Sequence, residues 1–148
     1  MKAARAAAVL TWVYAAGFGL PAIPVSIYLL SQGRLPSFMG LFDMYGGPWS
    51  ERFEPGTFTA LLGAFFVLTG MAVWSAWWLS QGRKAGAVVN LALLPVEAIF
   101  WLGFALPFPW LVGAARAVLI VIAWRSFADG QSPPPPSEAK AHTPLAGA

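Results

Sequence analysis

Glu97 and Arg116 are the one carboxylate and the one guanidinium that lie deep inside long apolar segments of this sequence. A carboxylate in such surroundings can carry a proton or act as a general acid or base, and a guanidinium can hold an anionic group. The two groups can also neutralise each other as an ion pair that fixes how two helices pack. The sequence leaves the structural and the functional interpretation open.

The positions of these two residues predict that they meet. Pro107 is at the centre of a short link, and Glu97 lies about ten residues before it and Arg116 about nine after, so helices would place both ~15 Å from the link. That depth is near the middle of a hydrocarbon layer about 30 Å thick. Asn90 and Trp101 share a helical face with Glu97. We therefore predict a buried polar site, for a ligand or a proton, made of Glu97, Arg116, Asn90 and Trp101.

The elements that position these residues are four apolar segments, at about 6–30, 57–79, 85–106 and 108–127. Hydrophobic residues make up 58% of the 148-residue chain and charged residues 10%, whereas soluble domains are about 25% charged. Each segment is near the ~20 residues that a helix needs to cross a bilayer. The first resembles a secretory signal, but its apolar run continues to Leu30, which favours a retained span. The predicted fold class is an all-α integral membrane protein with a four-transmembrane-helix bundle.

The loop charges predict the orientation of this bundle. One side carries most of the basic residues, namely Lys2, Arg5, Arg83, Lys84, Arg125 and Lys140. The opposite loops hold only Arg34 and Arg52. The positive-inside rule then places both termini in the cytoplasm of a multi-pass cell-membrane protein. Residues 128–148 include "SPPPPSEAK", and their composition predicts a disordered, proline-rich cytoplasmic tail.

The long connection at 31–56 is the most distinctive loop. Its residues Phe38, Leu41, Phe42 and Tyr45 have the spacing of one helical face, which predicts a short amphipathic helix at the outer interface, with Ser37 as N-cap. Such a helix could cover an outward-facing lipidic pocket. The candidate functional residues of this loop are Asp43, Tyr45 and Trp49. Its acidic residues are interpreted as a solvated cluster, because their spacing is not that of a calcium-binding loop.

Composition narrows the function without naming one. The chain has no Cys and its single His lies in the tail, so we predict no metal site and no cofactor. Catalytic and nucleotide-binding motifs are absent from the sequence. Its net charge of +3 is scattered at segment ends, which argues against nucleic-acid binding. Several tryptophans near one end of the spans are typical of an interfacial belt, with stacking on an apolar ligand as the alternative; they are Trp74, Trp77, Trp78 and Trp124.

Three functions stay open at this stage. The first is an accessory subunit or a bundle that binds an apolar, lipidic ligand, without catalysis, in the bilayer and within a larger membrane complex or homo-oligomer. The second is a proton-linked transporter or channel that uses Glu97. The third is a membrane-embedded lipid-modifying enzyme, in which Glu97 is the acid or base and Arg116 orients an anionic group.

Overall fold

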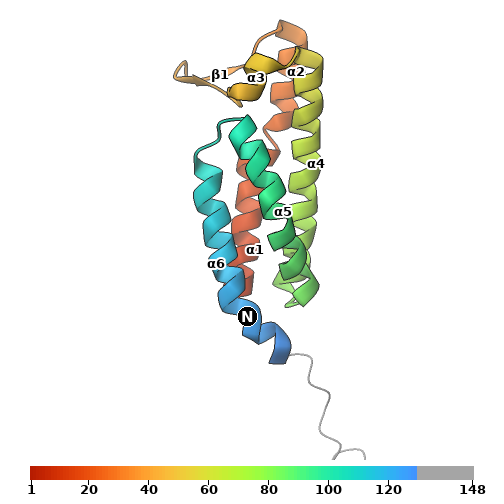
Figure 1. The fold of residues 1–148 in the computed structure, drawn as a ribbon, viewed down its shortest axis with the longest axis vertical. Coiled ribbons are helices and arrows are strands. Elements are labelled where there is room, and N and C mark those ends of the chain that lie inside the picture. The colour runs from red at the N-terminus through yellow and green to blue at the C-terminus, as the bar shows by residue number, and fades with distance from the viewer. Residues whose placement is uncertain (130–148) are drawn as a thin grey trace, which may run out of the picture.

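The structure is a computed structural model that describes residues 1–129 of the chain. This part is mostly helical, and it contains four helices long and apolar enough to cross a membrane (Figure 1). The first candidate span consists of α1 (Lys2–Tyr14), a π-helical turn η1 (Ala15–Gly19) and α2 (Ala22–Gln32), and the other three are α4 (Pro55–Ser80), α5 (Lys84–Gly103) and α6 (Phe108–Asp129). The prediction of four such helices is confirmed. Nearly all of the predicted tail, residues 130–148, lies outside the described residues.

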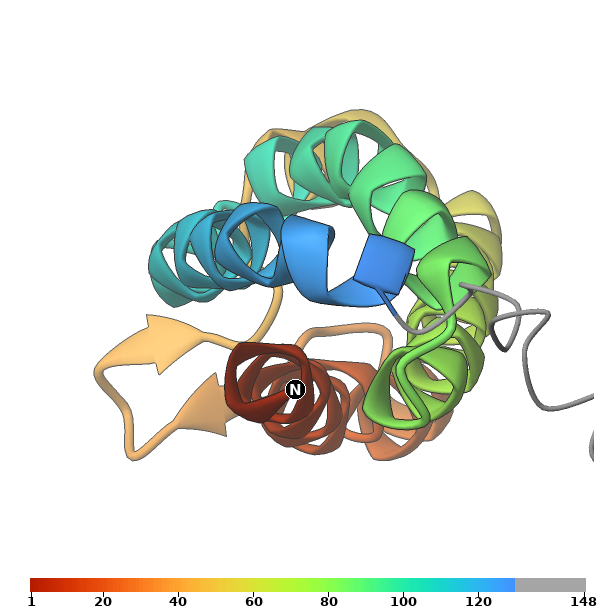
Figure 2. The ribbon, with the colours of Figure 1, turned by 90° about the horizontal axis from the view of Figure 1, so that it is seen from below.

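The four candidate spans lie side by side and close into a bundle (Figures 1 and 2). Short turns join α4 to α5 and α5 to α6, and α1 packs against both α4 and α6, which closes the ring. We call one end of the bundle the basic end; it holds the start of α1, the α4–α5 turn and the end of α6. The opposite end, with the 31–56 connection and the α5–α6 turn, is the hairpin end.

The interior differs between the two ends. Toward the basic end the core consists largely of alanines, with Leu79, Ile120 and Phe127, so the helices approach closely. Toward the hairpin end the core is aromatic and includes Tyr14, Tyr45, Phe58, Phe65, Trp101 and Phe104. Larger side chains therefore fill the space between the helices at this end.

The first span bends where η1 meets Pro21. The Leu20 amide donates to the Ala15 carbonyl over five residues, at 2.9 Å, which is the wide turn of a π-helix. Pro21 has no amide hydrogen, so the regular ladder stops before α2 begins. Beyond the bend α2 packs against α4 and, within the described residues, makes no contact with α6. Figure 1 shows that α2 extends past the start of α6 at the hairpin end.

The predicted amphipathic helix at 38–45 is wrong, because these residues form a β-hairpin. Strands β1 (Ser37–Phe38) and β2 (Phe42–Asp43) pair antiparallel, with Phe38 opposite Phe42. The turn between them uses Met39 and Gly40 in the left-handed region, at φ 51° and 73°, which a helix does not allow. The spacing of Phe38 and Phe42 does not distinguish the two structures, because residues i and i+4 are neighbours both on a helix and across a three-residue β-turn connection. Short helix α3 (Pro48–Arg52) follows the hairpin.

Two aromatic side chains hold this loop to the bundle. Tyr45 is buried, and its hydroxyl donates a hydrogen bond to the Phe18 carbonyl in η1. Trp49, on α3, lies against Gly103 at the end of α5, where the Cβ of any other residue would overlap the indole ring. The loop is thus attached both to the first span and to the end of α5.

Candidate functional site

The predicted Glu97–Arg116 contact is present between α5 and α6. Arg116 Nη2 donates to Glu97 Oε2 at 3.0 Å, and both side chains are 0% exposed. Three further polar atoms of the pair, Glu97 Oε1 and Arg116 Nε and Nη1, are buried without a hydrogen-bond partner among the described residues. The pair is therefore enclosed but only partly satisfied by protein groups.

Tyr14 and Trp101 cover the ion pair on its hairpin side. The Arg116 guanidinium lies over the Tyr14 ring, 5.3 Å from its centre, at a distance suited to a cation–π contact. The Trp101 indole nitrogen donates to the Tyr14 hydroxyl at 2.8 Å. Trp101 fits because α6 has Gly113 at this point, where a Cβ would meet the indole ring. These contacts join α1, α5 and α6 in one layer.

Asn90 forms a second polar layer nearer the basic end. Its amide nitrogen donates to Ser75 Oγ on α4 at 2.9 Å and to Thr11 Oγ1 on α1 at 3.4 Å. Each hydroxyl in turn donates to a carbonyl of its own helix. Sequence reasoning missed Thr11 and Ser75, since the sequence does not say which helix faces Asn90. About two helical turns separate Asn90 from Glu97, so the four predicted residues form two layers.

These polar layers are closed to the outside. Neither Glu97, Arg116 nor Asn90 lines any of the main cavities around the described residues. A reactant at one of these cavities would not touch the carboxylate. As it stands, the arrangement links all four candidate spans by polar contacts through the centre of the bundle.

The hairpin pocket lies at the other end of the aromatic core. It consists of two adjoining cavities of 320 and 280 Å³. Both are lined by residues from the bend in the first span, the hairpin and the α5–α6 turn, namely Phe18, Phe42, Tyr45, Leu106 and Phe108. The hairpin thus forms one wall of this pocket, between the bend in the first span and the α5–α6 turn.

The three outer-loop candidates take different positions at this pocket. Tyr45 lines it, and burial raises the pKa of this phenol above its usual range. Asp43 also lines it but is exposed, so its carboxylate lies at the rim. Trp49 does not line it, and its ring lies 5.3 Å from that of Phe104 and 5.4 Å from that of Phe100. It positions the loop rather than lining the pocket.

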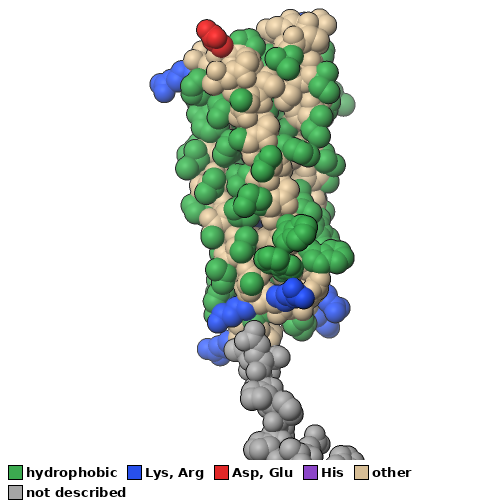
Figure 3. Space-filling model, turned by 90° about the vertical axis from the view of Figure 1, so that its right-hand side faces the viewer, with side chains coloured by type: hydrophobic (Ala, Val, Ile, Leu, Met, Phe, Trp, Pro, Cys, Tyr) green, Lys and Arg blue, Asp and Glu red, His purple; other side chains and the backbone are tan. Residues whose placement is uncertain are grey.

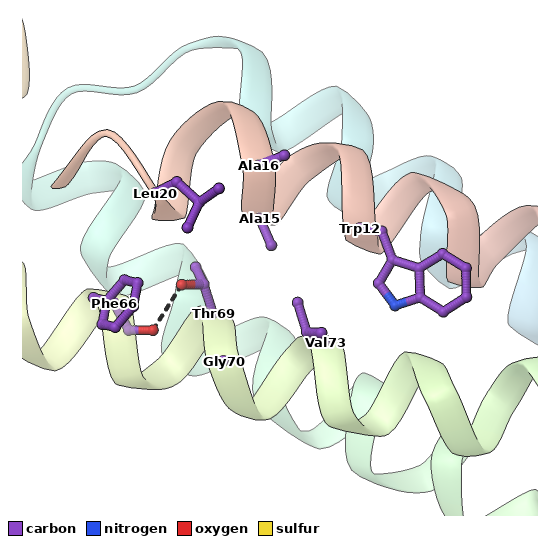
Figure 4. Close-up of a pocket in the computed structure, with 8 residues that line it drawn as sticks. All are labelled: Trp12, Ala15, Ala16, Leu20, Phe66, Thr69, Gly70 and Val73. Atoms are coloured by element: carbon purple, nitrogen blue, oxygen red, sulfur yellow. Dashed lines mark hydrogen bonds between the residues drawn. The ribbon is translucent and has the colours of Figure 1, made fainter. Parts of the chain in front are cut away.

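A second apolar hollow, the α1–α4 groove, runs along the bundle surface (Figure 4). Figure 4 shows its side chains facing one another from the first span and α4. One part of 380 Å³ is lined by Trp12, Ala15, Ala16, Leu20, Phe66, Thr69, Gly70 and Val73. An adjoining part of 380 Å³ shares Trp12, Gly70 and Val73 and continues to Trp74, Trp77 and Trp78. Thr69 turns its hydroxyl to the Phe66 carbonyl at 2.8 Å, so this hydroxyl is not a free donor to the groove.

Within the part of the chain that the structure describes, no cluster of three or more His, Cys, Asp or Glu side chains is placed to hold a metal ion. Comparison with protein-family models, with curated proteins and with solved structures finds no match for this chain.

Proposed function

We propose that this protein is a non-catalytic integral membrane bundle that binds an apolar ligand of the lipid class in the hairpin pocket. The observation that carries the proposal is the pocket itself, an apolar space assembled from three distant parts of the chain and covered by a hairpin. Ligand pockets are typically about 300–1,000 Å³ and mostly apolar; the cavity of 320 Å³ is at the lower end of this range, and the adjoining one adds 280 Å³ of space beside it.

The membrane orientation that we propose has the basic end in the cytoplasm and the hairpin end at the outer interface. Its support is the distribution of Lys and Arg between the two ends. In this orientation the hairpin tip lies at the outer membrane interface. Its side chains Met39 and Leu41 are 83% and 77% exposed. An apolar tip of this kind suits contact with the outer leaflet, beside a short interfacial helix α3.

Binding fits the site better than catalysis does. A general acid or base must reach its substrate within hydrogen-bonding distance. Glu97 and Arg116 do not line the hairpin pocket, and the Tyr45 hydroxyl is engaged by the Phe18 carbonyl. Asp43 is at the rim, exposed to solvent. The pocket wall can therefore hold an apolar body, with a polar group of the ligand near Asp43.

Gly17→Leu tests the pocket. Gly17 lines it, and a Cβ there meets no atom within 4 Å, so the larger side chain fills the pocket without a clash. Gly63→Leu is the matched control, because its Cβ also meets nothing and Gly63 lines neither hollow. We expect native mass spectrometry of protein extracted in polymer nanodiscs to find a retained ligand on the wild type and on Gly63→Leu. Gly17→Leu should retain it at least about tenfold less well, which corresponds to ~1.4 kcal/mol. Equal retention by all three would refute this site, and the same spectra would show any partner subunit.

Single cysteines test the orientation, since the chain has no native Cys. Ser37 in the hairpin and Gln81 in the α4–α5 turn are both exposed. On intact cells a membrane-impermeant maleimide should label Ser37→Cys and leave Gln81→Cys unlabelled until the cells are lysed. The reverse pattern would place the basic end outside.

A second candidate function is proton-linked transport through Glu97. The observation in its favour is the set of buried atoms without partners, Glu97 Oε1 and Arg116 Nε and Nη1. Buried polar atoms of this kind usually bind water, and water beside a carboxylate would supply a route for a proton. If this function holds, Glu97→Gln reconstituted in liposomes stays folded but loses pH-driven flux. Wild-type liposomes without such flux would remove this candidate.

A further inference from the structure

The α1–α4 groove has the length of one lipid leaflet. On α4 it extends from Phe66 to Trp78, and twelve helical steps correspond to about 18 Å. Half of a hydrocarbon layer of about 30 Å is ~15 Å. Near the basic end its wall is formed by Trp74 and Trp77, which are 65% and 61% exposed. The groove therefore matches one extended acyl chain lying along the bundle.

Lys and Arg residues lie at the basic end of the bundle, toward which the α1–α4 groove extends. Figure 3 shows Lys and Arg side chains around this end, with apolar side chains covering the length of the bundle above them. Arg5 is exposed and precedes Trp12, a groove residue, by seven positions, so the two share one face of α1. Arg83 is exposed in the α4–α5 turn. A Cβ at the adjoining Gly82 would meet the side chain of Met1, so the start of α1 lies beside this turn.

Not every cation of the basic end faces the groove. Lys84 has its Nζ over the ring of Trp124 on α6, 5.2 Å from the centre. Its charge is directed to the opposite side of α5. Arg5 on α1 and Arg83 in the turn that follows α4 are exposed guanidinium groups at the end of the two helices that form the groove.

We propose that the α1–α4 groove binds one anionic phospholipid from the leaflet on the basic side. One acyl chain lies against Trp12, Gly70 and Val73, and the headgroup phosphate lies between Arg5 and Arg83. A guanidinium binds phosphate through two parallel hydrogen bonds, and basic residues beside a membrane helix favour anionic headgroups. This site is at the end opposite the hairpin pocket and does not depend on the proposed function.

The headgroup part of the proposal is tested by charge removal. Purified protein, stripped of lipid, is titrated with phosphatidylglycerol or with phosphatidylcholine of the same acyl chains and followed by native mass spectrometry. We expect the first phosphatidylglycerol to bind wild type about tenfold more tightly than the first phosphatidylcholine. Arg5→Gln and Arg83→Gln should each reduce this preference severalfold. Arg34→Gln and Arg52→Gln remove the same charge at the hairpin end and should leave the preference unchanged.

The acyl-chain part is tested by filling the groove. A Cβ at Gly70 meets no atom within 4 Å, so Gly70→Leu occupies the groove without a clash, and we expect weaker binding of both lipids. Gly63→Leu is the control and should bind both as wild type does. Gly17→Leu, which fills only the hairpin pocket, should bind both phospholipids as wild type does. The two proposed sites, the groove and the hairpin pocket, are therefore tested independently of each other. Equal affinity of wild type for the two lipids, or unchanged binding by Gly70→Leu, would overturn the proposal.

Discussion

Arg116→Met removes the positive partner of Glu97 and leaves an apolar side chain of similar length in its place. Because Glu97 is 0% exposed, its carboxylate would then be buried beside no cation. Two charges about 4 Å apart attract by ~4 kcal/mol at an effective dielectric constant of about 20. Removal of one member of a buried pair typically costs about 3–5 kcal/mol. We expect a loss of this size in the free energy of unfolding.

The double variant Glu97→Gln/Arg116→Met separates the charge effect from the change in packing. Glu97→Gln alone leaves the guanidinium buried and should also destabilise the fold. Together the two substitutions leave no uncompensated charge, and neutral replacements of buried pairs are often well tolerated. The double variant should therefore recover most of the stability that Arg116→Met loses. The remaining difference includes the lost contact between Arg116 and the Tyr14 ring.

Thermal unfolding in mild detergent, followed by tryptophan fluorescence, measures these differences. For a chain of this length ~1 kcal/mol changes Tm by about 3 °C. Each single variant should thus lose roughly 10 °C, and the double variant only a few degrees. Single variants within about 2 °C of wild type, less than ~1 kcal/mol, would refute the reasoning. So would a double variant whose loss equals the sum of the two single losses.

Three further outcomes can be measured in the same way. Asn90→Ala removes the donor to Ser75 and Thr11 and should lower the unfolding free energy by about 1–2 kcal/mol; an unchanged Tm would contradict this. Gly113→Ala places a Cβ against the Trp101 ring and should cost ~1–3 kcal/mol, whereas Gly63→Ala, in open space, should be neutral or stabilising. Burial raises the pKa of Tyr45, so its contribution is complete below the unfolded pKa of about 10 and is lost as pH rises above it. Tyr45→Phe should lower Tm at neutral pH, through the lost bond to Phe18, and reduce the decline between about pH 9 and pH 11; an identical decline in wild type would count against a buried, neutral Tyr45.

The candidate spans and the Glu97–Arg116 ion pair could be predicted from the sequence for clear physical reasons. An apolar segment of about 20 residues must satisfy its own backbone, so its length and composition predict a helix. When a short link joins two such helices, the number of residues between the link and a side chain gives the depth of that side chain in the bundle. This count predicts that Glu97 and Arg116 lie at the same depth. Asn90 and Trp101 followed from helical periodicity and are buried, at 0% and 3% exposed.

Other features depend on tertiary contacts that periodicity does not contain. Phe38 and Phe42 have the spacing of a helix, yet Gly40 and the cross-strand stacking of the two rings select a hairpin. The partners of Asn90 could not be chosen, because they depend on α1 packing between α4 and α6. The hairpin pocket forms where the bend in the first span, the hairpin and the α5–α6 turn meet, and the sequence pattern does not say that these three segments meet.

Photo-crosslinking with a diazirine-labelled fatty acid tests the central claim, a lipid-class ligand in the hairpin pocket, most directly. The label is activated in native membranes and its attachment sites are mapped by peptide sequencing. The expected result is attachment on residues 37–46 and 104–108, separate from any attachment along the α1–α4 groove, lost in Gly17→Leu and kept in Gly63→Leu. Attachment spread evenly over exposed apolar residues of the helices, such as Val67, Val118 and Ile122, and unchanged in Gly17→Leu, would contradict the claim.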